Sequence, residues 1–231
     1  MIKVAILIDG GYFLKRLPAV RPDVDSTDPE EVVKSVWQLV RRHLAQLNEV
    51  WNASDPYQLL FRTFYYDARP YARKAHRPVS GTAVDYAKTD QARFREALFD
   101  GLRSSRNVAV RLGEVRRDVG RSWVLRGEAQ DALLEGRRGV GDLTDDDFAL
   151  AIRQKGVDMR IGLDIASLTL KRQVDTIVLV AGDADFVSAA KLARREGVRF
   201  VLDPLWQNVP PDLNEHIDGL TSGFPKPRGR G

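Results

Sequence analysis

The chain has 231 residues, enough for one large domain or two small ones, and its net charge of +4 and sequence pI of about 9.4 favour polyanionic partners. It contains no cysteine, which excludes disulfides, thiolate metal sites and cysteine nucleophiles and predicts a reducing, cytoplasmic setting. No apolar run reaches the roughly 18 residues of a membrane-spanning helix and the N-terminus lacks a signal-peptide pattern, so no membrane partner is expected.

The first half of the chain alternates between apolar runs and helical patterns. Residues 2–8 form a nearly continuous apolar run, which is typical of a strand buried on both faces of a parallel sheet. Residues 30–47 carry apolar side chains at helical spacing, and Asp28 with Pro29 marks the start of this helix. Similar patterns predict a short helix at 12–17, a strand at 57–66, a helix at 89–102 and a strand at 107–115.

The second half repeats this alternation after a less regular stretch. A short strand at 122–126 is expected to pair with the strand at 107–115 across Asp118-Val119-Gly120. Residues 128–150 have the composition of a flexible loop, and the acidic cluster Asp142 to Asp147 that of a solvated surface. The remaining expected elements are a helix from Asp158, a strand at 175–181, a helix at 187–196 closed by Gly197, a strand at 198–202 and a short helix within 205–220.

This alternation of strands and helices predicts an α/β fold with a mostly parallel central sheet and helices on both faces. We expect a single domain over residues 1–220, elaborated by a basic loop and a hairpin at about 68–150. Glycine, proline and basic residues dominate residues 221–231, which predicts a disordered tail. A homodimer is a further expectation, because the tryptophans suit an interface as well as a core; they are Trp37, Trp51 and Trp206.

Four aspartates lie where predicted strands end or helices begin. Asp9 follows the first strand, Asp158 lies at a helix start, and Asp183 and Asp185 follow the strand at 175–181. In a doubly wound sheet the carboxyl ends of the strands form one edge where ligands bind, so these side chains are predicted to share a pocket. Each aspartate alone also suits a turn or a helix cap, and the matching positions of all four are what favour a site.

Carboxylates in one pocket repel one another, and a divalent cation removes that conflict. Mg²⁺ or Mn²⁺ prefers carboxylate and water oxygens, and such an ion assists attack on a phosphoryl group. An acidic pocket in a basic protein therefore suits hydrolysis of a phosphodiester, with arginines holding the strand that is cut. A haloacid dehalogenase phosphatase would need acidic residues at positions 11 and 187, where this chain has Gly11 and Val187. A dinucleotide-binding domain would need a Gly-x-Gly-x-x-Gly motif after the first strand, which is absent from the sequence there. The sequence therefore argues against both alternatives.

Four motifs in order along the chain carry a resemblance to a known family. They are Ile6-Leu7-Ile8-Asp9-Gly10-Gly11-Tyr12-Phe13, Phe64-Tyr65-Tyr66-Asp67, Lys155-Gly156-Val157-Asp158 and Gly182-Asp183-Ala184-Asp185-Phe186. The chain resembles the NYN domain in its LabA-like branch over residues 1–205. This resemblance implies a PIN-like fold and metal-dependent ribonuclease activity, with the same four aspartates in the acidic centre. Many members of the family carry an asparagine three residues after the first aspartate, where this chain has Tyr12.

These observations predict an Mg²⁺- or Mn²⁺-dependent endoribonuclease that acts on single-stranded or loop regions of RNA. Asp9 and Asp183 are expected to bind the metal directly, and Asp158 and Asp185 directly or through water. The residues expected beside the site are Tyr12, Asp67, Lys155 and Asp164, and those expected to hold RNA are Tyr12, Arg69, Arg73, Lys74 and Arg77. A plain surface role for Lys155 and an internal hydrogen-bonded role for Asp164 remain open, as does a non-catalytic RNA-binding or regulatory module as the alternative function.

Overall fold

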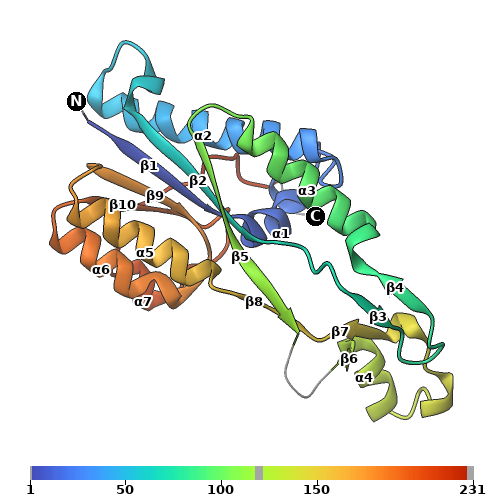
Figure 1. The fold of residues 1–231 in the computed structure, drawn as a ribbon. Coiled ribbons are helices and arrows are strands. Elements are labelled where there is room, and N and C mark those ends of the chain that lie inside the picture. Colours follow the sequence, from blue (N-terminus) through green and yellow to red (C-terminus); the bar gives the residue numbers. More distant parts are fainter. Residues whose placement is uncertain (1, 118–121, 228–231) are drawn as a thin grey trace.

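The computed structural model describes residues 2–117 and 122–227 and is built around a seven-stranded sheet (Figure 1). The strand order is β11-β10-β9-β1-β2-β5-β8, and every neighbouring pair is parallel except β5 and β8. The bounds are β1 Val4–Asp9, β2 Leu60–Ala68, β5 Val108–Arg117, β8 Ile152–Lys155, β9 Thr176–Val180, β10 Arg199–Asp203 and β11 Gly219–Leu220. The predicted α/β fold with a mostly parallel sheet is confirmed.

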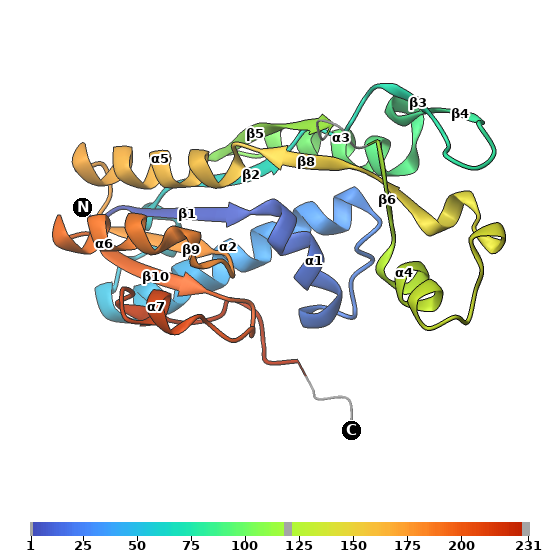
Figure 2. The ribbon, with the colours of Figure 1, turned by 90° about the horizontal axis from the view of Figure 1, so that it is seen from below.

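Helices cover both faces of this sheet (Figures 1 and 2). One face carries α1 (Gly10–Val20), α2 (Pro29–Trp51) and α3 (Asp90–Arg103), and the other carries α5 (Val157–Leu170), α6 (Val187–Arg195) and α7 (Pro211–Asn214). Along β1, Ile6 and Ile8 pack under α1, α2 and α3, whereas Ala5 and Leu7 pack under α5 and α6. Because successive strand residues point to opposite faces, a strand covered on both sides is apolar throughout, as the sequence of β1 is. None of the described helices is long and apolar enough to cross a membrane.

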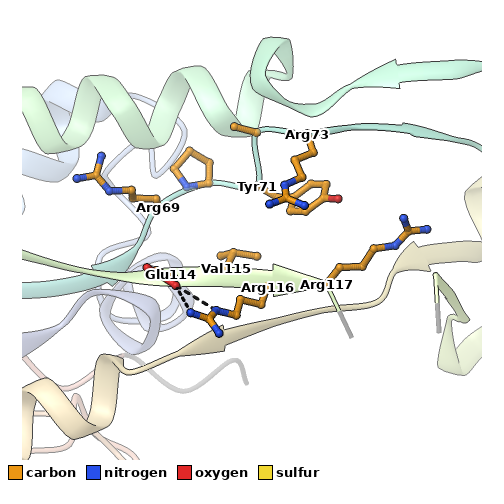
Figure 3. Close-up of a pocket in the computed structure, with 9 residues that line it drawn as sticks. Arg69, Tyr71, Arg73, Glu114, Val115, Arg116 and Arg117 are labelled. Atoms are coloured by element: carbon orange, nitrogen blue, oxygen red, sulfur yellow. Dashed lines mark hydrogen bonds and ion pairs between the residues drawn. The ribbon is translucent and has the colours of Figure 1, made fainter. Parts of the chain in front are cut away.

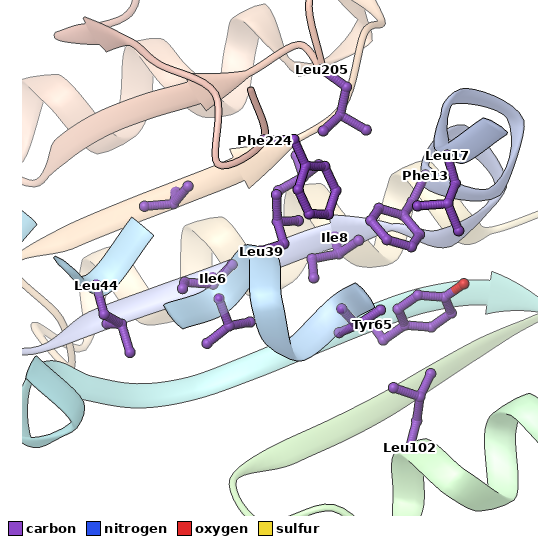
Figure 4. Close-up of a cluster of buried hydrophobic side chains, with 14 of the residues drawn as sticks. Ile6, Ile8, Phe13, Leu17, Leu39, Leu44, Tyr65, Leu102, Leu205 and Phe224 are labelled. Carbon is purple, nitrogen blue, oxygen red and sulfur yellow. The ribbon is translucent and has the colours of Figure 1, made fainter. Parts of the chain in front are cut away.

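The chain after β11 differs from the expected disordered tail at residues 221–227. Phe224 is 2% exposed in the core beneath α1 and α2, where its ring lies 6.4 Å from that of Phe13 (Figure 4). The indole Nε1 of Trp206 donates to the carbonyl oxygen of Phe224 at 2.8 Å, and the amide of Gly223 donates to Asp203 at 2.9 Å. One buried aromatic ring is enough to anchor a short polar segment. Residues 228–231 of that prediction lie outside the described residues.

The segments around β5 pair differently from the predicted hairpin. β6 (Trp123–Leu125) pairs with β7 (Phe148–Leu150), because β5 continues to Arg117 and its edge is taken by β8. Helix α4 (Gly127–Leu134) occupies part of the predicted loop, while the turn Asp118-Val119-Gly120 lies outside the described residues. Together with the hairpin of β3 (Lys74–His76) and β4 (Ala83–Asp85), these elements project beyond the carboxyl ends of the parallel strands (Figure 1). We call residues 71–88 and 122–151 the extension.

Two acidic residues of the extension form contacts that the prediction of a solvated surface did not include. Asp145 accepts the backbone amide of Val79 at 2.9 Å, and this hydrogen bond joins the two parts of the extension. Asp147 forms an ion pair with Arg138 at 2.8 Å. The charge run therefore ties loops together locally, which its composition alone does not reveal.

Candidate active site

The sheet order places the predicted aspartates at one edge. Asp9 ends β1, and its parallel neighbour β9 leads into Asp183, with Ile8 opposite Val180 in the register. Asp185 lies in the 3₁₀ turn that joins β9 to α6, and Asp158 lies in the first turn of α5. The adjacency of β1 and β9, on which the sequence argument depended, is present.

The helix-cap interpretation holds for one of the four aspartates and fails for three. Asp9 caps α1, since its Oδ1 accepts the amide of Tyr12 at 3.1 Å. Asp183 accepts the amide of Asp185 at 3.2 Å, which shapes the turn but does not cap α6. Asp158 lies two residues after the N-cap position, which Gly156 occupies with a φ of 83° that favours glycine.

Asp158 and Asp185 face a common groove between α5 and α6. This groove has a volume of about 510 Å³ and is also lined by Ser188 and by apolar side chains of both helices. Within the described residues, neither carboxylate accepts a hydrogen bond or forms an ion pair. Two unpartnered carboxylates beside each other are available to a ligand of positive charge.

The electrostatics of the edge show that these carboxylates interact. The pKa of Asp9 is raised to about 6, mainly by burial and also by the negative charges of Asp158 and Asp67, against the lowering effect of the hydrogen bond from Tyr12. The pKa of Asp158 is also raised, first by burial and then by the charges of Asp183 and Asp185. Both shifts arise first from burial and second from neighbouring negative charge, and a bound cation would lower both pKa values.

The carboxylate oxygens of the four aspartates suit a hard divalent ion, but in their present positions these side chains do not form a set of metal ligands. Across residues 2–117 and 122–227, no three carboxylate or imidazole groups converge closely enough to hold a metal ion. Asp158, Asp183 and Asp185 are exposed, and mutual repulsion favours rotamers that keep their charges apart. Binding a metal here requires these side chains to turn toward one another.

Two glycines let aromatic rings press against the ends of β1 and β9. A Cβ atom on Gly10 would lie 2.7 Å from the hydroxyl of Tyr65, and one on Gly182 would lie 2.9 Å from the hydroxyl of Tyr12. Burial raises the pKa of Tyr12 to about 12, and its hydroxyl donates to the carbonyl oxygen of Pro204. Tyr12 therefore packs beside the acidic edge, by which we mean the end of the sheet that carries Asp9, Asp158, Asp183 and Asp185. Its hydroxyl proton is used in the hydrogen bond to Pro204, which argues against the predicted contact with an RNA phosphate.

Gly10→Ala is expected to lower the free energy of unfolding by about 1–3 kcal/mol, because the added methyl group overpacks the site against the buried ring of Tyr65. Urea denaturation measures this difference. The matched control is Gly127→Ala, since a Cβ atom there meets nothing within 4 Å and alanine favours the helix. Equal stability of the two variants would show that the close packing at Gly10 is easily relieved.

The structure gives the other predicted neighbours distinct roles. Asp67 is fully buried and ion-paired with Arg95 of α3, and burial raises its pKa. Asp164 is partly buried; it accepts the hydroxyl of Tyr66 at 2.8 Å and lies 3.3 Å from Arg111. Lys155 is exposed at the end of β8, opposite Glu114 of β5.

Sequence reasoning did not find Arg95 and Gln154. Arg95 lies 28 residues beyond its partner Asp67, within an ordinary amphipathic helix. The side-chain oxygen of Gln154 lies 3.8 Å, and that of Asp9 3.5 Å, from the position that a Cβ atom on Gly11 would take. Both residues reach the site through contacts between distant segments, for which no local pattern exists.

A basic groove lies next to the acidic edge. It has a volume of about 630 Å³ and runs between the segment after β2 and the end of β5 (Figure 3). Of the predicted RNA-binding residues, Arg69 and Arg73 line it, together with Arg116 and Arg117. Lys74 and Arg77 lie on the hairpin of the extension, where Arg77 is 3.5 Å from Asp146.

Comparison with known proteins places the chain in a family. No curated protein gives a significant match. Two solved structures are similar: a protein of unknown function from Vibrio parahaemolyticus (15% identity, 96% of this chain and 95% of that chain covered, TM-score 0.44) and a Sir2 complex with a p53 peptide and NAD⁺ (12% identity, 94% and 86%, TM-score 0.30). Neither score is high enough to carry an argument. The family model of the NYN domain matches residues 3–213, and NYN domains are PIN-like nucleases, which act on nucleic acid and typically use divalent metals. The chain therefore belongs to the NYN domain family.

Proposed function

We propose that this chain is a metal-dependent endoribonuclease of the LabA-like branch, with Asp9, Asp158, Asp183 and Asp185 as its acidic centre. The observation that carries the proposal is the position of Asp9 and Asp183 at the ends of adjacent parallel strands, with Asp158 close enough to raise the pKa of Asp9. Family membership supports nuclease chemistry, and the basic groove beside this edge supports a polyanionic substrate.

In this proposal each aspartate has a defined task. Asp9 uses one oxygen to cap α1, which orients its carboxylate toward the edge of the sheet. Asp9 and Asp183 would hold Mg²⁺ or Mn²⁺, and Asp158 and Asp185 would complete the ligand set directly or through water. When bound, such an ion lowers the pKa of water and stabilises negative charge on a phosphoryl group. Arg95 neutralises Asp67, so that the charge of this buried neighbour is partly compensated beside Asp9.

The basic groove supplies the sites for the RNA backbone. Arg69, Arg73 and Arg117 lie along it, and their guanidinium groups form no ion pair within the described residues (Figure 3). Guanidinium groups bind phosphate through paired hydrogen bonds. Single-stranded or loop RNA is the substrate that we propose, because a flexible strand can follow the groove and still bring a phosphate to the acidic edge.

The function is tested by incubating the full chain with end-labelled RNA that contains both a hairpin stem and its loop. The expected result is internal cleavage in the loop with Mn²⁺ or Mg²⁺ and none with EDTA. The alternative function, a non-catalytic RNA-binding module, is favoured by one observation: the described residues include no preformed metal cage. Retention of RNA without cleavage under every metal condition would support that alternative and overturn the proposal.

Removing the two arginines at the start of the groove is expected to weaken RNA binding and its dependence on salt. For the double variant Arg69→Ala/Arg73→Ala, the slope of log K against log salt should become shallower by about 1.4, since each lost phosphate contact on a single strand contributes about 0.7. Fluorescence anisotropy in EDTA, with salt varied, measures both quantities. The control is Arg41→Ala/Arg42→Ala on α2, outside the groove; an equal change in both double variants would exclude a specific role for the groove.

A further inference from the structure

A third hollow lies between the extension and the start of α3, and aromatic side chains from separate segments gather around it. Its volume is about 460 Å³, within the range of roughly 300–1,000 Å³ that is typical of small-molecule sites. The rings belong to Tyr71, Tyr86, Trp123 and Phe148, and we call this hollow the aromatic pocket. All four side chains are only partly buried, so ring surface remains open to an incoming group.

The aromatic rings are held in place by packing. Tyr71 and Tyr86 meet edge to face, with ring centroids 5.6 Å apart and planes at 74°. Trp123 and Phe148 stand on β6 and β7, which pair with each other. A site that stacks a planar ligand needs rings already fixed in this way, because ordering them on binding would reduce affinity.

Polar groups at the same pocket suit the edge of a nucleobase. Gln91 and Gln154 both line it, and within the described residues neither side-chain amide forms a hydrogen bond. A glutamine amide offers one acceptor and two donors, which is the combination that pairs with base edges. The pocket thus combines stacking surface with uncommitted amide groups.

The aromatic pocket opens toward both parts of the proposed active site. Arg69 and Tyr71 line it and the basic groove together. On its other side, Gln154 and Asp9 flank Gly11, and Arg95 forms the ion pair with Asp67. A strand whose phosphates follow the groove would therefore present a base to this pocket beside the acidic edge.

We propose that the aromatic pocket holds one unstacked base of single-stranded RNA next to the phosphate that is cut. This inference rests on the proposed function for its location and deepens it, since it makes one base position the determinant of substrate selection. A base inside a continuous duplex is already stacked and paired, and it reaches such a pocket only after leaving the helix.

An abasic scan tests this proposal. Short single-stranded RNAs, each lacking one base, are titrated in EDTA against the full chain with fluorescence anisotropy as the readout. We expect one position to lose affinity by roughly 5- to 150-fold, the effect of one base–aromatic stack, while the other positions change little. Equal sensitivity at all positions would overturn the proposal.

Variants connect the sensitive position to the pocket. Tyr71→Ala and Tyr86→Ala should each weaken binding of the complete RNA. In each variant, the RNA that lacks the base at the sensitive position should bind as tightly as the complete RNA, because the stack that this base formed is already lost. The matched control is Tyr57→Ala. Tyr57 is 43% exposed in the 3₁₀ turn before β2, at the end of the sheet where the parallel strands begin, whereas the pocket lies beyond the end where they finish. Thermal denaturation shows whether each variant folds. If a variant does not fold, the abasic scan of the unmodified chain still tests the proposal.

Cleavage with Mn²⁺ is measured separately, so the two proposals can fail independently. Position-dependent binding without cleavage would support the pocket and contradict the nuclease. Cleavage with position-independent binding would support the nuclease and overturn the pocket. Persistence of the single sensitive position in both tyrosine variants would also overturn it, since the base would then be held elsewhere.

Discussion

Asp9→Asn and Asp183→Asn are each expected to reduce cleavage of single-stranded RNA by at least about 100-fold, because even groups behind the metal ligands cost 10–100-fold when they are removed. Asparagine keeps the shape of the side chain but removes the negative charge that a divalent ion requires. In Asp9→Asn the amide oxygen can still accept the Tyr12 amide, so α1 keeps its cap. Initial rates in Mn²⁺ give the comparison.

The stability of these variants separates a chemical effect from a folding effect. Burial penalises the charged form of Asp9, so a neutral replacement should leave the thermal midpoint in EDTA unchanged or higher. Asp100→Asn is the control, since this exposed residue near the end of α3 has, within residues 2–117 and 122–227, the single ion-pair partner Arg103 at 2.7 Å. Full cleavage activity in both site variants would contradict the assignment of the acidic centre.

Asp203→Ala is expected to destabilise the fold by about 3–5 kcal/mol, the largest effect on stability that we foresee. Asp203 is fully buried at the end of β10, where its carboxylate meets three donors. They are His43 at 2.8 Å, the amide of Leu205 at 2.8 Å and the amide of Gly223 at 2.9 Å. Truncation leaves all three buried without an acceptor, and each such group costs about 1–3 kcal/mol.

Guanidinium or urea denaturation measures this loss, with the midpoint and slope both recorded. The control is Asp25→Ala, because Asp25 is exposed and its side chain accepts hydrogen bonds from the amide and hydroxyl of the nearby Thr27; its effect should be small. A loss for Asp203→Ala of the same size as the control would mean that solvent or other groups replace the missing acceptor.

The sequence predicts the two strands that lead to Asp9 and Asp183 because their signals are local. An apolar run that ends at Asp9, and another that ends before Asp183, indicate two strands covered on both faces whose ends point the same way. Their adjacency is a property of the topology, which the sequence makes plausible and the pairing of β1 with β9 establishes. The orientation of the four side chains cannot be read from residue spacing, because it depends on charge repulsion and on what is bound.

The features of the structure that the sequence does not predict depend on contacts between distant segments. Nothing near β6 indicates that its partner is β7, 23 residues on, rather than β5. The hydroxyl of Tyr12 is taken by Pro204, 192 residues away, and no motif at Tyr12 encodes that partner. The burial of Phe224 is not predicted from the sequence, because the glycine, proline and basic residues around it have the composition of a disordered tail.

The extension has a consequence for how the substrate preference of this protein can diverge. It consists of two segments of the chain, one between β2 and α3 and the other between β5 and β8, and none of the four aspartates lies in either. All four rings of the aromatic pocket lie in these two segments, Tyr71 and Tyr86 in the first and Trp123 and Phe148 in the second. If the two proposals hold, the pocket that selects the substrate and the acidic centre lie in separate stretches of the chain, so exchange of the two segments between homologues offers a route to new specificity with the four aspartates unchanged.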